Sequence, residues 1–476
     1  MLSVIMNKGV DNSALYQSVD SGLTDIGTNW AKGHINYCYT TGIIAGRGNG
    51  KFDPSATVTA LEAAKMLLVA VGYDPAIEGF EGADWAINVS VRADEQGIFE
   101  GFTKDLSAPL NRDDAALLIY NALDVEMIQS YTTNNYPIAY SDHRTILADK
   151  YGVIKVQGVV VANEWASLAS DDGDAALKEG KTTIYNGEGI FSTTGNTTVS
   201  KEDASLKTQT FNVSTPVDML GKTVNLYIKK TTILADSTVY GDPVVSDVNT
   251  VVTTGETVLY SGAKDPQVDY DKLLGENGLT DKDAKYFWNY NSGKYIPNTT
   301  EKYGDKTANV KGATLTIIDN NGDGEVDYVL SVEKALADIT SVNSKKETVT
   351  VRTLGTLDNK DVVGYEDMAK EDVVLYVQYG GRTYLEKPEV VTGEMEHFNV
   401  KGTEKYMTVG GEKYKADELE TNARTEVVKF DVTECDKANG VQFETSYNFY
   451  LDDYGNVIAF EEVEAAAKNY ALVLDS

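Results

Sequence analysis

One pattern occurs twice near the N-terminus, first as Trp30-Ala31, Gly42-Ile43 and Gly46, and again at the same spacing as Trp85-Ala86, Gly97-Ile98 and Gly101. In each copy the last glycine precedes a short loop and then an apolar stretch that starts with acidic residues, over residues 58–70 and 110–123. A repeat with a period of roughly 50 residues indicates a module of one helix, a loop and a second helix. Because such modules usually form binding surfaces, the pattern favours binding over catalysis.

Other residues of the first copy agree with a known family. They are Leu23-Thr24-Asp25-Ile26, Gly50-Lys51-Phe52-Asp53-Pro54 and Val58-Thr59-Ala60-Leu61-Glu62. Together with the Trp-Ala and Gly-Ile pairs, they resemble the S-layer homology (SLH) repeat, the module that anchors bacterial surface proteins to cell-wall polysaccharide. The resemblance spans residues 23–125 and implies α-helical SLH repeats at 20–75 and 80–125.

The resemblance also implies a groove for a negatively charged, pyruvylated sugar of the secondary cell-wall polysaccharide. A guanidinium can hold a carboxylate through two hydrogen bonds, so Arg112 is the best candidate for that contact and Arg47 could supply a second charge. Trp30 and Trp85 match the tryptophan of the family, either as sugar contacts or as core residues. The first copy has Thr59-Ala60-Leu61-Glu62 where Thr-Arg-Ala-Glu is typical, which puts direct sugar binding by this copy in doubt.

The two ends of the chain suggest that the natural protein is longer. The opening stretch Met1–Met6 resembles Met66–Val71, so residues 1–12 are interpreted as the remnant of a preceding SLH repeat. Tyr470–Leu474 is predicted to be a strand without a visible partner. No basic segment followed by an apolar one marks a secretion signal in this chain. We nevertheless expect an extracellular protein of a bacterial cell wall or S-layer, because the resemblance implies it.

Composition excludes some classes of function. The chain of 476 residues carries 73 acidic and 42 basic residues, for a formal charge of −31. Phosphate repulsion argues against nucleic acid as a partner, and no apolar run approaches the length of about 18 residues that a membrane-spanning helix needs. The histidines His34, His143 and His397 have no metal-binding spacing, and no GxSxG motif is present. We therefore do not expect an enzyme.

Beyond the repeats the pattern changes to short β-type runs separated by Gly, Asn and Asp turns. Residues 126–150 are predicted to be a linker, and 151–335 and 336–476 to be β-rich modules. The predicted fold class is multidomain α + β, with N-terminal helical SLH repeats followed by mostly antiparallel all-β modules, either small barrels or sandwiches. Weak helical periodicity also suggests short helices near 333–338 and 461–468.

Three stretches of the β region look like variants of one hairpin. Their strand pairs are Val224–Ile228 with Thr231–Leu234, Val373–Val377 with Thr383–Leu385, and Tyr447–Leu451 with Val457–Phe460. The intervening Gly and Asn residues can adopt the positive φ angles that tight hairpin turns require. The recurrence predicts related small β modules.

One acidic loop lies between two β-type runs, at Asp319-Asn320-Asn321-Gly322-Asp323-Gly324-Glu325-Val326-Asp327. Oxygen-bearing side chains at alternating positions suit Ca²⁺, which takes six to eight oxygen ligands. The EF-hand pattern fails, because Leu330 stands where its closing glutamate is required. A shorter loop resembles the calcium hairpins of integrin β-propellers, with Asp319, Asn321, Asp323 and Asp327 as side-chain ligands and the Glu325 carbonyl as another. The alternative is an ordinary Asp/Asn/Gly turn.

Taken together, these features predict a structural, S-layer-type surface protein. It would bind secondary cell-wall polysaccharide non-covalently through its SLH repeats, while the β modules self-assemble into a lattice or face outward. A structural calcium ion would stiffen one hairpin. Two alternatives remain at this point: a wall-anchored hydrolase that acts on polysaccharide, and a calcium-dependent surface adhesin.

Overall fold

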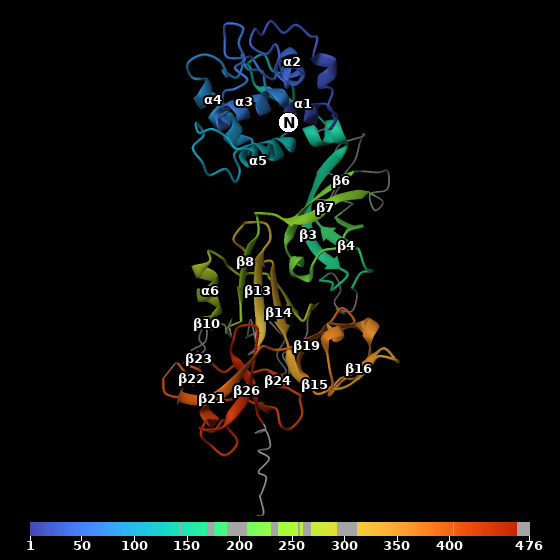
Figure 1. Cartoon of the computed structure of the whole chain (residues 1–476), viewed down its shortest axis with the longest axis vertical. Helices are drawn as coiled ribbons and strands as arrows, with labels where there is room; N and C mark the ends of the chain where they lie inside the picture. The colour runs from blue at the N-terminus through green and yellow to red at the C-terminus, as the bar shows by residue number, and fades with distance from the viewer. Residues whose placement is uncertain are drawn as a thin grey trace, which may run out of the picture. The chain divides into compact units, whose positions relative to one another are not determined.

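The computed structural model describes residues 1–141, 144–168, 176–187, 207–229, 237–255, 258–259, 268–292, 312–402 and 404–463 (Figure 1). The chain divides into two compact units. The first comprises residues 1–158, 185–212 and 225–243, and the second 159–184, 213–224 and 244–476. Helices occupy the N-terminal part, and mostly antiparallel sheets follow, which confirms the predicted fold class.

The N-terminal helices are short and are separated by loops. In chain order they are α1 (Leu2–Met6), α2 (Lys32–Thr40), α3 (Ala60–Ala70), α4 (Trp85–Glu95) and α5 (Arg112–Leu123). The predicted helices at 58–70 and 110–123 are thus α3 and α5. The predicted remnant at 1–12 contains α1, whose Leu2, Ile5 and Met6 pack against the helical core.

Both α3 and α5 begin with a capping box. Thr59 Oγ1 accepts the Glu62 N–H at 3.2 Å, and Glu62 Oε2 accepts the Thr59 N–H at 3.0 Å. At α5, Asn111 and Asp114 exchange the equivalent bonds. The two helix starts lie side by side, because the Leu110 N–H donates to the Val58 carbonyl at 2.8 Å. Reciprocal capping satisfies backbone donors that have no partner inside the helix, so these residues determine where each helix begins.

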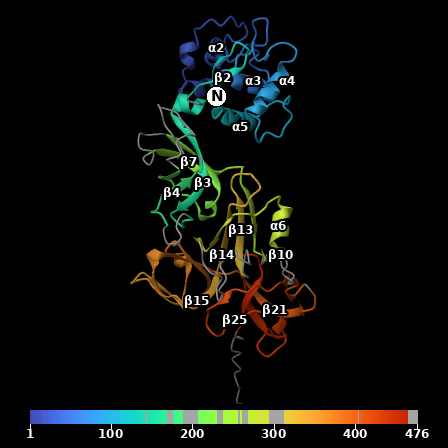
Figure 2. The same cartoon turned by 180° about the vertical axis from the view of Figure 1, so that it is seen from behind.

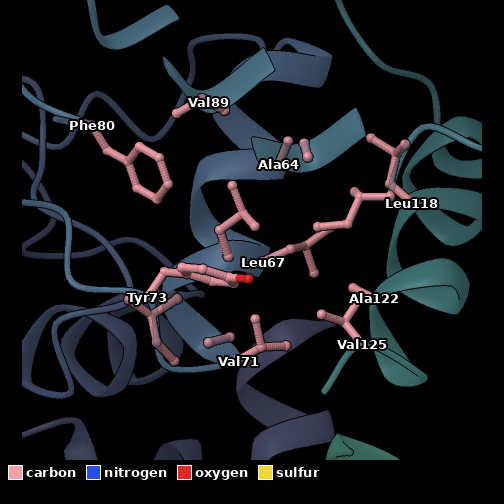
Figure 3. Packing of buried hydrophobic residues seen from close by; sticks show 14 of the residues in the cluster. Ala64, Leu67, Val71, Tyr73, Phe80, Val89, Leu118, Ala122 and Val125 are labelled. Carbon is pink, nitrogen blue, oxygen red and sulfur yellow. The ribbon is translucent and has the colours of Figure 1, made fainter. Parts of the chain in front are cut away.

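The helical core forms where α3 packs against α4 and α5. The apolar residues of α3 recur at helical spacing, as Ala60, Ala64, Leu67 and Leu68, and all four are buried. Figure 3 shows side chains of α3 and α5, among them Leu67 and Leu118, pointing toward one another. The stripe spacing that predicts each helix therefore also determines which face of α3 is buried.

Residues 126–150 differ from the predicted linker. They contain a hairpin of β1 (Ile128–Tyr131) and β2 (Pro137–Ala139), and Ile146 is buried in the helical core. The Ile128 N–H donates to the Val71 carbonyl at 2.8 Å. Gly72, at φ +107°, permits this approach, since a Cβ there would lie 2.5 Å from the Ile128 carbonyl oxygen. A polar, irregular stretch is therefore an integral part of the helical core.

A five-stranded sheet follows, in the order β5-β4-β3-β6-β7. Its strands are β3 (Val153–Asn163), β4 (Thr182–Tyr185), β5 (Thr208–Phe211), β6 (Thr223–Lys229) and β7 (Thr238–Val245).

The second unit continues with a sheet in the order β12-β11-β14-β13-β8. Its strands are β8 (Thr250–Thr254), β11 (Lys285–Trp288), β12 (Asn291–Ser292), β13 (Ala313–Asp319) and β14 (Tyr328–Glu333). Helix α6 (Tyr270–Glu276) follows a short parallel pair formed by β9 (Val258–Leu259) and β10 (Val268–Asp269). The core of this sheet joins Leu315 and Ile317 of β13 to Tyr270 and Leu274 of α6.

Two further sheets complete the described part of the unit, with orders β17-β16-β15-β19-β20-β18 and β23-β22-β21-β26-β27-β25; β24 also pairs with β15 (Figure 2). The first contains β15 (Ala335–Asn343), β16 (Thr348–Val351), β17 (Gly355–Asp358), β18 (Val362–Val363), β19 (Val373–Tyr379), β20 (Arg382–Glu386) and β24 (Glu420–Thr421). The second contains β21 (Val390–Asn399), β22 (Tyr406–Val409), β23 (Glu412–Tyr414), β25 (Val428–Lys429), β26 (Ser446–Leu451) and β27 (Val457–Glu462). Over the described ranges none of the sheets closes into a barrel.

Two of the three predicted hairpins are confirmed as β19–β20 and β26–β27. The return strand Thr231–Leu234 of the first hairpin lies outside the described residues, as does Tyr470–Leu474. The helix predicted near 333–338 is wrong, because β15 begins at Ala335 and pairs with β19. At 461–468, residues 461–462 belong to β27, and the remainder from residue 464 is also outside the described part.

Candidate functional site

A groove of about 840 Å³ lies in the helical region. Its walls come from the loop that follows Gly42, from the first turns of α3, from residues 80–82 and from Trp85 at the start of α4. Apolar side chains line much of it, including Ile43, Phe52, Met66 and Phe80. A mostly apolar concavity with a few polar groups is the usual form of a ligand site.

The loop that lines the groove is held by backbone bonds and by one aspartate. The Arg47 N–H donates to the Lys51 carbonyl at 2.8 Å, and Gly46, at φ +74°, makes this tight turn possible. Asp25 accepts the Phe52 and Asp53 N–H groups at 2.9 and 2.8 Å. These bonds lower the pKa of the Asp25 carboxyl, since they favour its charged form.

Both basic residues of the groove are bound to groups of the protein itself. Arg47 Nη1 lies 3.0 Å from Glu62 Oε1, and Arg47 Nη2 donates to the Thr57 carbonyl at 3.2 Å. Lys65 Nζ donates to the Phe80 carbonyl at 2.6 Å and lies 5.9 Å from the centre of the Trp85 ring. These contacts connect the loop to α3, and α3 to the start of α4.

The structure brings together two of the four predicted sugar contacts. Arg47 and Trp85 line the same groove. Trp85 also packs against the helical core, so the two interpretations of this residue are compatible. Trp30 does not line the groove. It is 84% exposed, and its ring makes an edge contact with His34. Arg112 lies outside the groove as well.

Arg112 occupies the same helical position as Ala60. Each is the first residue of its helix, directly after the capping Asn111 or Thr59. Ala60 is fully buried, whereas Arg112 is exposed. Within the described ranges the Arg112 guanidinium makes no hydrogen bond or ion pair, so it is available to an incoming anion.

The start of α5 carries a second, smaller hollow of about 390 Å³, lined by Asp113, Asp114, Ala116, Leu117 and Tyr120. Lys104 Nζ donates to both carboxylate oxygens of Asp114, at 2.6 and 2.8 Å. This pair lowers the pKa of the Asp114 carboxyl. The Lys104–Asp114 pair corresponds to the Arg47–Glu62 pair at α3, because in both copies the acidic residue of the capping box pairs with a cation of the preceding loop. The cation stands at a different position of the loop in the two copies.

Sequence reasoning missed Lys65 and Lys104 as partners of these sites. Lys65 lies on α3 one turn after the capping residues. A lysine is common at such a helical position, so the sequence pattern does not mark it as a binding residue. Lys104 follows Gly101 by three positions, whereas Arg47 follows Gly46 directly. The spacing of the basic residue therefore differs between the copies, and a position-by-position match of the two loops does not place Arg47 opposite Lys104.

The acidic loop at 319–327 joins β13 to β14, as predicted. Its side chains accept backbone N–H groups: Asp319 from Asn321, Gly322 and Gly324, Asn321 from Asp323, Asp323 from Glu325, and Asp327 from Asn320. Burial raises the pKa of Asp327, and the charges of Asp319 and Asp323 add to this effect. Within the described residues no group of three or more His, Cys, Asp or Glu side chains is placed to hold a metal ion. Calcium stays a prediction.

Among the helices that the structure describes, none combines the length and the apolar character needed to cross a membrane.

Comparison with known proteins identifies a family domain within the helical region. The family model of the S-layer homology domain matches residues 22–64. The chain is 27% identical to a cell surface protein of Thermoanaerobacter kivui, over 38% of this chain and 21% of that protein. It is 26% identical to the middle cell wall protein of Brevibacillus brevis, over 36% of this chain and 15% of that protein. It is 27% identical to exoglucanase XynX of Acetivibrio thermocellus, over 29% of this chain and 13% of that protein.

These findings identify an extracellular, cell-wall-associated surface protein. Residues 22–64 are an S-layer homology domain, the part that anchors such proteins to the wall. The chain spans about a fifth or less of the length of these relatives.

Proposed function

We propose that this protein attaches to pyruvylated secondary cell-wall polysaccharide, and that its β modules form a surface lattice or its outward-facing part. SLH domains in general bind cell-wall polysaccharide. The observation that carries the proposal is the groove beside α3, which is lined largely by residues of the matched domain, Arg47 among them. Trp85 also lines the groove but lies outside the matched residues 22–64. In this proposal residues 80–125 act as a second SLH copy.

The two sugar-binding roles fall on different residues. Trp85 and the apolar lining of the groove offer a surface for the carbon–hydrogen face of a sugar ring, since aromatic rings combine apolar area with defined geometry. Arg112 offers an exposed guanidinium for the pyruvyl carboxylate, which it can hold through two hydrogen bonds. Its place at the start of α5 adds a favourable helix dipole for an anion.

The test is co-sedimentation with purified cell-wall sacculi, before and after their polysaccharide is removed. The wild-type protein should pellet only with walls that keep the polysaccharide, and Arg112→Ala should pellet less. A control for the loss of one guanidinium is Arg144→Ala, which lies outside both hollows, where it contacts Asp149 and the ring of Tyr140. Pelleting that is independent of polysaccharide would contradict the proposal.

A second candidate is a wall-anchored hydrolase, because two relatives are named an exoglucanase and an amylopullulanase. The structural role is preferred, since the cell surface protein of Thermoanaerobacter kivui aligns over 38% of this chain, a larger share than either hydrolase, at 29% and 37%. Release of reducing sugar from xylan, cellulose or isolated wall polysaccharide would favour the hydrolase. Formation of calcium-dependent sheets in the absence of any sugar release would favour the lattice protein.

A further inference from the structure

The groove beside α3 carries more acidic than basic side chains. Its lining includes the carboxylates of Asp53, Glu62 and Glu81 and the cations of Arg47 and Lys65, for a formal charge of −1. Asp53 and Glu81 are exposed residues at its rim. A ligand that enters the groove therefore meets a net negative lining.

Neither cation of the groove is free to compensate a further negative charge. Arg47 faces Glu62 at 3.0 Å and also donates to the Thr57 carbonyl. Lys65 donates to the Phe80 carbonyl at 2.6 Å. A sugar carboxylate would have to compete with these acceptors while it approached three carboxylates, and like charges brought together at a binding surface are unfavourable.

The remaining lining suits an uncharged ring. Phe52 and Trp85 provide aromatic area, against which the carbon–hydrogen face of a pyranose can pack. Carboxylate oxygens accept hydrogen bonds but donate none, so Asp53 and Glu81 at the rim are suited to sugar hydroxyl or amide N–H groups. These are the groups that a neutral or N-acetylated sugar presents.

The comparison of α3 with α5 also favours an uncharged ligand at the start of α3. Where α5 presents the exposed guanidinium of Arg112, α3 has the buried methyl group of Ala60. The residue best suited to hold a carboxylate is thus missing at the start of α3.

We propose that the groove beside α3 takes an uncharged sugar ring of the wall polysaccharide and discriminates against carboxylated rings. This rests on the proposed function and assigns a ligand class to one of its sites. The chain would then contact the polysaccharide at two chemically different points: a neutral ring in this groove and a charged one at Arg112.

The test isolates the groove in the full chain that carries Arg112→Ala. Polysaccharide released from purified walls is used in two forms, untreated and after mild acid has removed its ketal-linked pyruvate. Titration calorimetry with this variant should show that the untreated form binds no more tightly than the treated form. Adding Trp85→Ala should weaken both by about tenfold, the scale of a lost aromatic contact. Tyr136→Ala, which removes an exposed aromatic outside the groove, should change neither.

A charge reversal provides a second measurement that does not depend on removing Trp85. In the same Arg112→Ala background, Glu81→Lys should make binding of the untreated form roughly two- to fivefold tighter than that of the treated form, the range of one exposed ion pair. Asp94→Lys, an equal charge change at an exposed residue of α4 outside the groove, should leave the ratio of the two affinities unchanged.

The outcomes separate the two proposals. If the wild-type protein binds neither form, the proposed function itself fails. If the wild type binds but the Arg112→Ala variant binds nothing, or prefers the untreated form before any charge is reversed, the inference on the groove is overturned while the anchoring role stands. Absence of any gain from Glu81→Lys would likewise contradict it.

Discussion

Glu62 Oε1 lies 3.0 Å from Arg47 Nη1, while Oε2 of the same carboxylate accepts the Thr59 N–H at the start of α3. One side chain thus completes the helix cap and connects the Gly-rich loop to the first turn of the helix. Because this loop forms a wall of the groove, the cap and the candidate binding site depend on the same residue.

Glu62→Ala should destabilise the helical region by about 1 kcal/mol, since it removes both a capping contact and the partner of Arg47. Glu62→Gln should cost less, because glutamine can still complete a capping box. Denaturant unfolding followed by far-UV circular dichroism measures both. If the two variants were equally destabilised, the ion pair rather than the cap would be the main contribution.

Leu118→Ala should cost about 2–5 kcal/mol, the usual range for truncating a buried leucine. Leu118 is fully buried on α5 and lies in the core shared with α3. Val91→Ala, at an exposed position of α4, is the matched control and should be nearly neutral. The same denaturation experiment applies. A loss below about 1 kcal/mol for Leu118→Ala would mean that α5 does not pack on α3 as described.

The stability of the β region should fall as pH rises from about 4 to about 6. Burial raises the pKa of Asp417 from 3.8 to about 6, and the neighbouring Asp452 adds to the shift. Between these two values the folded state holds a proton that the unfolded state has lost, so folding is progressively disfavoured as that proton leaves. Thermal melting across this pH range measures the effect.

Asp417→Asn should flatten this pH dependence, since asparagine keeps the acceptor that the Glu418 N–H uses but carries no titrating proton. Glu412→Gln, on the exposed strand β23, should leave the slope unchanged. A slope of the same size in Asp417→Asn would assign the pH dependence to other groups.

Calcium, if it binds the β13–β14 loop, should raise the melting temperature of the wild-type protein. Asp323→Asn should abolish this rise while leaving the calcium-free stability close to that of the wild type. The reason is that asparagine can still accept the Glu325 N–H but no longer contributes a charge. Differential scanning calorimetry with calcium and with a chelator checks both expectations. An equal response in the variant would exclude the loop as the calcium site.

Some features were accessible from the sequence because they depend on residues close together in the chain. The helix starts at Thr59 and Asn111 follow from local capping patterns. The hairpins β19–β20 and β26–β27 follow from short turns between β-type runs. The acidic loop between β13 and β14 was located for the same reason.

Other features depend on contacts between distant segments. Residues 333–338 have helix-forming side chains, but pairing with β19 places Ala335–Asp338 in a strand, because tertiary context overrides a weak propensity. The segment predicted as a linker contributes Ile128 and Ile146 to the helical core, and its polar neighbours conceal this in the sequence. The cation of the capping pair at α5 was missed because it comes from a loop of different spacing.

The sequence by itself determined the helix–loop–helix pattern of the N-terminal region, its SLH character and the β-rich nature of the remainder, since periodicity, caps and turns are local. Only the tertiary structure decided that Arg47 and Trp85 share one groove while Trp30 and Arg112 lie outside it. It also decided that the charge of Arg47 is compensated by Glu62 whereas Arg112 remains exposed. The physical reason is that ion pairing and burial depend on how separate loops and helices pack, and the spacing of residues along the chain does not specify that packing.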